Sequence, residues 1–284
     1  MRRSAWWASI LVLGACAGTS ATKAPGGGAG GQSVPIPADL AGAVELSSKI
    51  GVELYLQDKA SWIGTDAMLE KVAPGDREAI GGYITIRDGE INGRPKPSWS
   101  VIFFSREDSP TVLYEISVPM EAGKRPSVKT VAPPKPIDGA LAVLVKARQA
   151  ALDAAGPYAQ PINPAVLPGE IMKDSGVLVY LLAGTRKEDT VVFGKHFRVL
   201  VSTDGTVRQV LPLSKSILEL STQAPGGGKT EALVVSQIVT DYPLETHVFA
   251  SLSARLPVYV ATERGDWVVE GAKISFLGPR DDRK

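Results

Sequence analysis

The sequence predicts an α+β fold in which helices pack on antiparallel β-meanders. Residues 39–59 and 138–156 carry apolar side chains at helical spacing. Each of these segments is followed by short runs of β-branched and aromatic residues, which are typical of strands. Two Asp-Gly pairs, Asp88-Gly89 and Asp204-Gly205, have the composition of tight hairpin turns. A helix followed by hairpin-connected strands is characteristic of the α+β class.

In the first half of the chain, Asp39 is the expected N-cap of a helix that runs to about Lys59. Residues 52–56 leave a strand open as an alternative, because two glycines weaken the helical pattern. A second, shorter helix is expected from Thr65 to Val72. Three strands are predicted after it, at residues 83–87, 98–105 and 111–118.

The second half begins after a proline-rich segment, residues 131–137, which predicts a stiff hinge of polyproline type. Asp138 is the expected cap of the next helix, and Gly156-Pro157 is expected to end it. A proline-rich connection then leads to residue 168. Strands are predicted at residues 176–183, 196–203, 207–213, 232–239, 247–252, 258–262 and 267–277.

The same patterns divide the chain into segments. They are a leader (1–15), a glycine-rich linker (16–38), an N-terminal α+β half (39–130), the hinge (131–137), a C-terminal α+β half (138–279) and a charged tail (280–284). Both halves have the order of a helix followed by strands that include an Asp-Gly hairpin. The matching pieces, residues 83–89 and 197–205, resemble the helix-plus-meander modules of PepSY and cystatin-like envelope domains. Related and unrelated halves both remain open.

The leader has the pattern of an export signal. Arg2 and Arg3 precede an apolar run, residues 5–13, which is shorter than the roughly 20 apolar residues that span a bilayer. Leu13-Gly14-Ala15-Cys16 resembles the lipobox of bacterial lipoproteins. The resemblance implies that Cys16 is lipidated, that residues 1–15 are removed and that the new N-terminus is acylated. The alternative is an ordinary secreted protein cut near Ala15 or Ala17.

This resemblance implies a location as well as an anchor. Two or more acyl chains give stable membrane attachment, where one chain binds only marginally. Ala17, rather than an aspartate, follows the cysteine, which in Gram-negative lipoproteins is similar to sequences directed to the outer membrane. We therefore expect a lipid-anchored protein on the periplasmic face of the outer membrane. The linker contains the run Gly26–Gly31, interrupted only by Ala29, and its roughly 20 residues would give a reach of about 25 Å.

The composition excludes some partners. The 284-residue chain has 31 basic and 30 acidic side chains, and removal of the leader with Arg2 and Arg3 would leave 29 basic ones. No basic stripe remains, so nucleic acid is not an expected partner. Cys16 is the only cysteine, so the fold cannot contain an internal disulfide. Hydrophobic residues make up 44% of the chain, which is enough for a core without one.

No cofactor-binding motif is found. Residues 226–230, with the sequence GGGKT, end like a P-loop, but Gln223 stands where that motif needs its first glycine. The residues that follow predict a strand instead of the helix that a P-loop requires. A loop between strands is the better interpretation, and we expect no bound cofactor.

The two histidines, His196 and His247, are the only weak candidates for catalytic residues. Alternation places His196 on the strand face of Arg198, and a nearby cation disfavours metal binding. His247 would share a face with Phe249. No pair of ligands has the spacing of a metal site, so none is expected. A Ser–His–Asp site assembled in space is not excluded by sequence.

Three tryptophans, Trp62, Trp99 and Trp267, are expected to anchor the core or a sheet face. Trp267 follows a projecting loop and is the one for which exposure has to be checked.

Three functions are compatible with these patterns. The sequence favours a lipid-anchored envelope protein with a non-enzymatic binding or structural role, whose partner is another envelope protein, a peptide or a cell-wall component. The first alternative is a lipid-anchored hydrolase with a site near His196 or His247. The second is a carrier of an apolar ligand. A flat exposed apolar patch would favour the first function, convergent titratable groups the hydrolase, and a closed apolar pocket the carrier.

Overall fold

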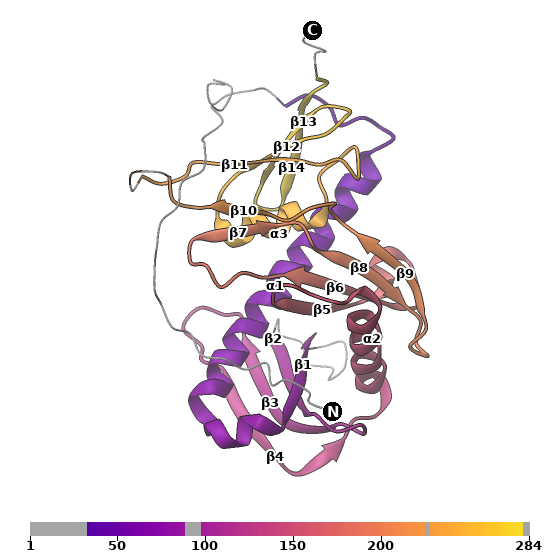
Figure 1. Ribbon diagram of the computed structural model, residues 1–284, viewed down its shortest axis with the longest axis vertical. Helices are drawn as coiled ribbons and strands as arrows, with labels where there is room; N and C mark the ends of the chain where they lie inside the picture. Colours follow the sequence, from indigo (N-terminus) through magenta and orange to yellow (C-terminus); the bar gives the residue numbers. More distant parts are fainter. Residues whose placement is uncertain (1–32, 89–97, 225, 227, 281–284) are drawn as a thin grey trace. The chain divides into compact units, whose positions relative to one another are not determined.

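The computed structural model describes residues 33–88, 98–224, 226 and 228–280, and it has the predicted α+β fold (Figure 1). The leader with its lipobox, Cys16 and most of the linker lie outside these residues. Gly89 of the first predicted hairpin and residues 281–284 also lie outside them.

The N-terminal half contains one long helix and one antiparallel sheet. Helix α1 (Ala41–Lys71) is followed by the 3₁₀ helix η1 (Pro74–Ala79). The sheet has the order β1-β2-β3-β4, so each strand pairs with the next one along the chain. Its strands are β1 (Ile80–Arg87), β2 (Ser98–Ser105), β3 (Thr111–Pro119) and β4 (Ser127–Pro136).

Helix α1 replaces the two helices that the sequence predicts, and the alternative strand at residues 52–56 is wrong. The helix continues through Gly51 and Gly64 because both glycines lie against other elements. A Cβ atom at Gly64 would lie 2.6 Å from a methyl carbon of Val101 in β2. Asp39 does not cap the helix, which begins after Leu40, and the Asp39 carboxylate pairs with Arg264 instead.

The C-terminal half begins with helix α2 (Gly139–Ala155) and a second antiparallel sheet. Asp138 is the N-cap residue, as expected, but its side chain makes no capping hydrogen bond. The sheet has the order β5-β6-β8-β9, and strands β7 and β10 form a separate two-stranded sheet. The elements are β5 (Ile162–Pro168), η2 (Gly169–Met172), β6 (Val177–Ala183), β7 (Thr190–Phe193), β8 (Phe197–Val201), β9 (Val207–Pro212) and β10 (Leu218–Ser221).

The predicted hairpin at Asp204-Gly205 is confirmed. It joins the antiparallel strands β8 and β9, with Gly205 at a φ of +88° and the N–H of Ser202 donating to the carbonyl of Thr206 at 2.8 Å. Glycine adopts this left-handed conformation without the steric cost of a Cβ atom.

A third sheet, with the order β11-β12-β13-β14, ends the chain. The predicted strand at residues 247–252 is wrong, because these residues belong to helix α3. The helix crosses between β11 and β12 and makes that pair parallel. The single strand predicted at residues 267–277 is a hairpin of two strands. The elements are β11 (Leu233–Ser236), α3 (Glu245–Ala254), β12 (Val258–Ala261), β13 (Asp266–Glu270) and β14 (Lys273–Gly278).

Both proline-rich segments are strands, contrary to the prediction. Most of the expected hinge at residues 131–137 belongs to β4, and the connection after Pro157 contains β5. Both strands lie at the edge of their sheet. Proline lacks an N–H group, which an edge strand does not need on its open side, so a proline-rich edge strand has the composition of a linker.

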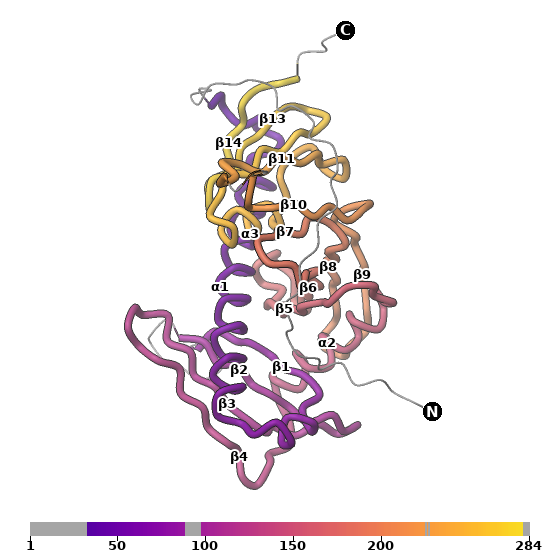
Figure 2. Tube along the Cα trace, turned by 60° about the vertical axis from the view of Figure 1, so that its left-hand side comes forward, coloured from indigo at the N-terminus to yellow at the C-terminus, as the bar shows by residue number. Residues whose placement is uncertain are grey.

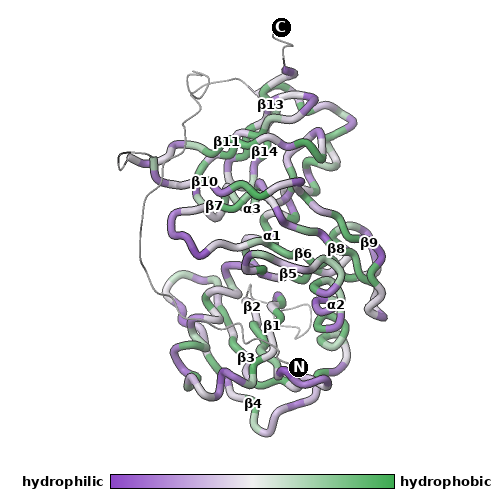
Figure 3. Tube along the Cα trace, in the orientation of Figure 1, coloured by the Kyte–Doolittle hydropathy of each residue, from purple (hydrophilic) through white to green (hydrophobic). Residues whose placement is uncertain are grey.

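The two halves share a hydrophobic core. One cluster of buried residues combines β1 and β2 of the first sheet with β6 and β8 of the second and with α2, and includes Ile84, Ile102, Val179 and Val199. Helix α1 covers the opposite face of the first sheet and also contacts β5, β14 and α3 (Figures 1 and 2). Strand β6 is buried along its whole length, and its run is mostly hydrophobic in Figure 3. The boundary at residue 131 therefore does not divide two independent cores.

The folded part begins before the predicted linker end at residue 38. Val34 pairs with Phe276 of β14, its N–H donating to the Phe276 carbonyl at 2.9 Å, and Ile36 packs on the core of the third sheet. At the other end, Arg280 of the predicted tail pairs with Asp266. No helix within the described residues is both long enough and apolar enough to cross a membrane.

Candidate functional site

His196 is buried and bonded to the backbone. Its Nδ1 accepts a hydrogen bond from the N–H of Ala183 at 2.9 Å, and its Nε2 lies 3.2 Å from the carbonyl oxygen of Val192. This geometry fits a neutral ring that carries its proton on Nε2. Burial lowers the pKa of His196 to about 4. The ring does not share an exposed face with Arg198, because His196 precedes β8 and points into the protein.

His247 is also buried, in the first turn of α3. Its Nδ1 accepts a hydrogen bond from the N–H of Leu244 at 2.9 Å, which caps the helix. The ring stacks on Phe193 with 6.0 Å between ring centroids. Burial, with a smaller contribution from His196, lowers the pKa of His247 to about 4. Both weak catalytic candidates are thus neutral near pH 7 and hydrogen-bonded to backbone groups.

The surroundings of these rings do not resemble a catalytic site. Within the described residues, no hydroxyl or carboxylate side chain bonds to either histidine. A nucleophile and a base need such a bond, or a geometry close to it. The same residues hold no cluster of three or more histidine, cysteine, aspartate or glutamate side chains that could bind a metal.

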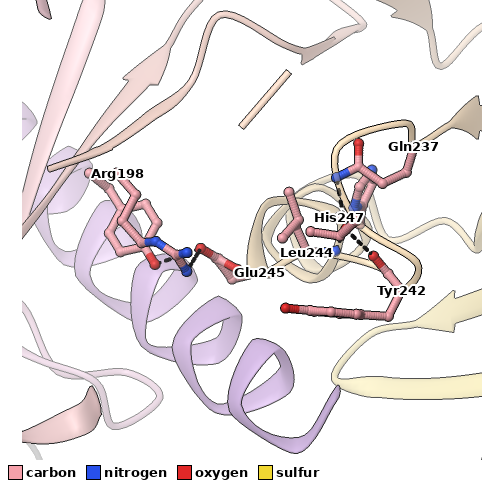
Figure 4. A network of polar contacts seen from close by, with 8 residues as sticks. Arg198, Gln237, Tyr242, Leu244, Glu245 and His247 are labelled. Atoms are coloured by element: carbon pink, nitrogen blue, oxygen red, sulfur yellow. Dashed lines mark hydrogen bonds and ion pairs between the residues drawn. The ribbon is translucent and has the colours of Figure 1, made fainter. Parts of the chain in front are cut away.

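A buried ion pair connects the second sheet to α3 (Figure 4). Glu245, which is 1% exposed, accepts hydrogen bonds from the hydroxyl of Tyr180 at 2.6 Å and from Nη1 of Arg198 at 3.0 Å. Glu245 lies in the first turn of α3, where the helix dipole also favours a negative charge. Burial and the Glu245 carboxylate raise the pKa of Tyr180 well above its usual 10, so the hydroxyl stays a donor. The network is fully paired and fits a structural role.

The open edge of the third sheet carries exposed apolar side chains. Val234 of β11 is 57% exposed, and Tyr259, its partner on β12, is 41% exposed. Ile238, two residues after β11, is 66% exposed. We call these three side chains the β11 surface. Val234 and Tyr259 are paired across β11 and β12, and Ile238 follows β11 in the chain. Exposed apolar side chains that lie near one another mark interaction sites.

The backbone of β11 adds to this surface. The N–H of Leu233 donates to Pro257 and the N–H of Gln237 to Ala261, so alternate residues of β11 face β12. The backbone groups of Val234 and Ser236 therefore point to the side on which the sheet has no further strand. This edge could not be predicted from the sequence, because residues 247–252 of α3 were expected to form a strand that would have continued the sheet.

The tryptophan predictions are partly wrong. Trp99 and Trp267 are buried, the latter completely, and its ring nitrogen donates to the hydroxyl of Thr262. Trp62 is 66% exposed on α1 and does not anchor the core. Its position is explained by the helix: Ala60, Gly64 and Ala67 face the first sheet, which leaves Trp62 on the outer side.

A hollow of about 340 Å³ lies beside the C-terminal end of α3 and is lined mainly by Leu252, Leu256 and Pro257. It is open to solvent and is bordered by the charged residues Arg255 and Glu270, unlike the closed apolar pocket that a carrier would need.

The loop before β11 is a connection between strands, as predicted. Gln223 pairs with Lys229 across it, and the N–H of Ala224 donates to the carbonyl of Gly228 at 2.8 Å. A strand follows the loop, so it lacks the helix of a P-loop.

Comparisons of the sequence with known protein families and curated proteins, and of the fold with solved structures, find no match.

Proposed function

We propose that this protein is a lipid-anchored component of the bacterial envelope that binds an extended segment of another envelope protein at the β11 surface, without catalysing a reaction. Cys16 would hold the lipid, and the expected location is the periplasmic face of the outer membrane. The linker would allow the folded part to reach a partner away from the lipid surface.

The observation that carries the proposal is the free edge of β11 with its exposed apolar side chains. An extended peptide can add a strand to such an edge, where main-chain hydrogen bonds provide affinity and side-chain contacts provide specificity. Val234 and Tyr259 would contact the added strand and its side chains on the outer face. The paired state of both histidines supports a binding role over hydrolysis.

Three other sheet edges are less suited to this role. Strand β4 carries Pro133, Pro134 and Pro136, and β5 carries Pro164 and Pro168. Proline on an edge strand prevents the addition of another strand. The edge of β14 is partly covered by Val34. Strand β11 contains no proline and no charged residue.

Site-specific crosslinking in cells tests the binding. A photoreactive amino acid at Ile238 should give a crosslinked product of defined mass. The substitution Val234→Lys, which places a charge on the edge strand, should remove that product. The matched control is Val210→Lys on β9, an exposed edge valine of another sheet, which should leave it unchanged. No product at Ile238, or a product that survives Val234→Lys, would contradict the proposed surface.

The anchor is tested separately. The substitution Cys16→Ala should move the protein from the membrane fraction to the soluble fraction. Unchanged sedimentation with membranes would disprove lipid attachment through Cys16. It would not contradict the proposed role of the β11 surface.

A further inference from the structure

The outward side chains along β11 have the same order in both chain directions. From residue 233 to residue 238 exposure alternates, with the odd-numbered side chains buried and the even-numbered ones exposed. The exposed side chains are Val234, Ser236 and Ile238, so a small polar residue lies between two large apolar ones. A symmetric dimer needs a surface that complements itself. This order meets that need when two copies of the segment run in opposite directions.

The free backbone groups of β11 lie at the same three positions. The N–H groups of Leu233 and Gln237 bond to β12, so the even-numbered residues turn their backbone groups to the side where no strand lies among the described residues. Two antiparallel residues whose free groups face each other exchange two hydrogen bonds. With a twofold axis between the two copies of Ser236, Val234 of each copy is opposite Ile238 of the other. All three pairs are then hydrogen-bonded pairs.

This register is favoured by the exposed apolar side chains. Val234 is 57% exposed and Ile238 is 66% exposed, and the axis at Ser236 places each of them beside the other across the seam. Cross-strand pairs of β-branched residues stabilise a sheet. An axis moved by one residue in either direction would instead place Ser236 opposite one of these two side chains.

The charge of the segment also permits a second copy. Residues 232–240 contain no charged side chain, so two copies can approach along this stretch without repulsion between like charges. Glu231 and Asp241 end the uncharged stretch on its two sides and limit the seam to it. By contrast, edge strand β9 carries Arg208 and edge strand β10 carries Glu219. A charge on an edge strand disfavours pairing with another copy, and β11 lacks this protection.

We infer that β11 pairs with β11 of a second copy of this chain, antiparallel about a twofold axis at Ser236, when no other segment occupies the edge. The inference rests on the proposed function in one respect, that the β11 edge is a site for strand addition. The second copy regulates that site by covering it. A single short strand pair buries less than the roughly 1,200–2,000 Å² of stable complexes. The dimer therefore dissociates on dilution, and a segment that binds more tightly can displace the second copy.

Single-cysteine variants test the register, because Cys16 is the only cysteine of the chain. In the full chain carrying Cys16→Ser, Ser236→Cys should form a disulfide-linked dimer under mild oxidation. The Cα atoms of a hydrogen-bonded antiparallel pair are about 5.5 Å apart, which a disulfide can span. Val234→Cys and Ile238→Cys should each stay monomeric alone and should form a mixed dimer when combined. The matched control is Val210→Cys, at an exposed valine of edge strand β9, which should stay monomeric.

The two single variants stay monomeric for a geometric reason. In this register the two copies of residue 234 are four residues apart along the seam, or roughly 13 Å, and the same holds for residue 238. A disulfide cannot bridge Cα atoms more than about 7 Å apart.

Sedimentation of the Cys16→Ser chain gives a readout that needs no new cysteine. Its mean mass should rise with protein concentration toward twice the mass of the chain. Val234→Lys should keep the chain monomeric at every concentration, because it places a charge at the seam. Val210→Lys should dimerise like the parent.

Two results would overturn the inference. One is a chain that sediments as a monomer at every concentration, with no more disulfide dimer from Ser236→Cys than from Val210→Cys. The other is an efficient dimer of Val234→Cys with itself, which would place the axis elsewhere.

The crosslink from Ile238 in cells separates this inference from the proposed function by the mass of the product. A product of twice the mass of the chain indicates self-pairing, and a product of any other mass indicates the segment of another protein. Either product can be absent while the other forms, so each proposal fails on its own result.

Discussion

The two buried histidines should make the stability of the folded protein depend on pH. Both have a folded-state pKa of about 4, below the usual 6.5, because burial opposes the charged ring. Between these values the unfolded chain binds more protons than the folded chain. Their contribution to stability is therefore complete above about pH 6.5 and is lost as the pH falls toward 4.

We expect the free energy of unfolding to fall between about pH 7.5 and pH 5, by about 2 kcal/mol for each histidine. Asp58 acts in the opposite direction, since its pKa is raised from 3.8 to about 6 and the folded state gains protons there. Urea unfolding at the two pH values measures the net effect. His247→Gln, which keeps an acceptor for the Leu244 N–H, should reduce the dependence, and Asp58→Asn should steepen it. Equal stability at both pH values would contradict the burial of the two rings.

For single residues, the sequence shows which side chains are present but not which of them are buried. The absence of metal-ligand spacing around His196 and His247 was visible in the sequence, but the burial of the two rings was not. Trp267 and Trp99 are buried as expected, whereas the exposure of Trp62 was predicted the other way. The side of α1 that faces the sheet depends on Gly64 and Ala67, small residues that carry little hydrophobic signal.

At the scale of elements, the glycines of α1 distinguish packing from helix propensity. Gly42, Gly51 and Gly64 all lie in this helix. Propensity alone would make alanine better at each of the three by up to about 1 kcal/mol. An added Cβ atom would overlap with Val248 and the Glu245 carbonyl at Gly51 and with Val101 at Gly64, whereas at Gly42 it meets nothing within 4 Å.

Gly51→Ala and Gly64→Ala should therefore lower the free energy of unfolding by about 1–3 kcal/mol, the usual cost of overpacking. Gly42→Ala should leave it unchanged or raise it slightly. Denaturant unfolding followed by circular dichroism compares the three variants. If all three alanine variants raised the free energy of unfolding equally, the close approach of α1 to α3 and β2 would be refuted.

Strands β2 and β3 were predicted well, and their predicted and observed bounds agree to within one residue. Both strands are rich in β-branched and aromatic residues, which are typical of strands. Helix α3 was predicted as a strand because its buried face, which includes Val248 and Ala250, belongs to a ten-residue segment too short to show helical periodicity clearly. Strands β4 and β5 were missed because prolines on an edge strand have the same composition as a linker.

At the scale of the whole molecule, the sequence predicted the class but not the arrangement. The shared core of the first two sheets combines residues about 100 positions apart, such as Ile84 and Val179, in one buried cluster. No local pattern encodes such contacts. The open edge of β11 results from how the third sheet ends, which only the assembled topology shows.

A glycine-rich linker separates the expected anchor from the folded part. The compact unit begins at Ser33, and the glycine-rich composition before it predicts a flexible chain of about 25 Å reach. Deleting residues 17–31 should leave the Tm of the folded part unchanged, because Val34, Ile36 and Asp39 keep their contacts. It should also leave the protein in the membrane fraction.

The same deletion should reduce the crosslink from Ile238, since the β11 surface would lose its reach toward a partner. The matched control replaces residues 17–31 by a Gly/Ser sequence of equal length, which should restore the crosslink because only length and flexibility are required. A large fall in Tm after the deletion would show that these residues belong to the folded part. If the Tm holds and the crosslink also persists, the partner must approach the lipid surface itself, and the linker would not be needed for reach.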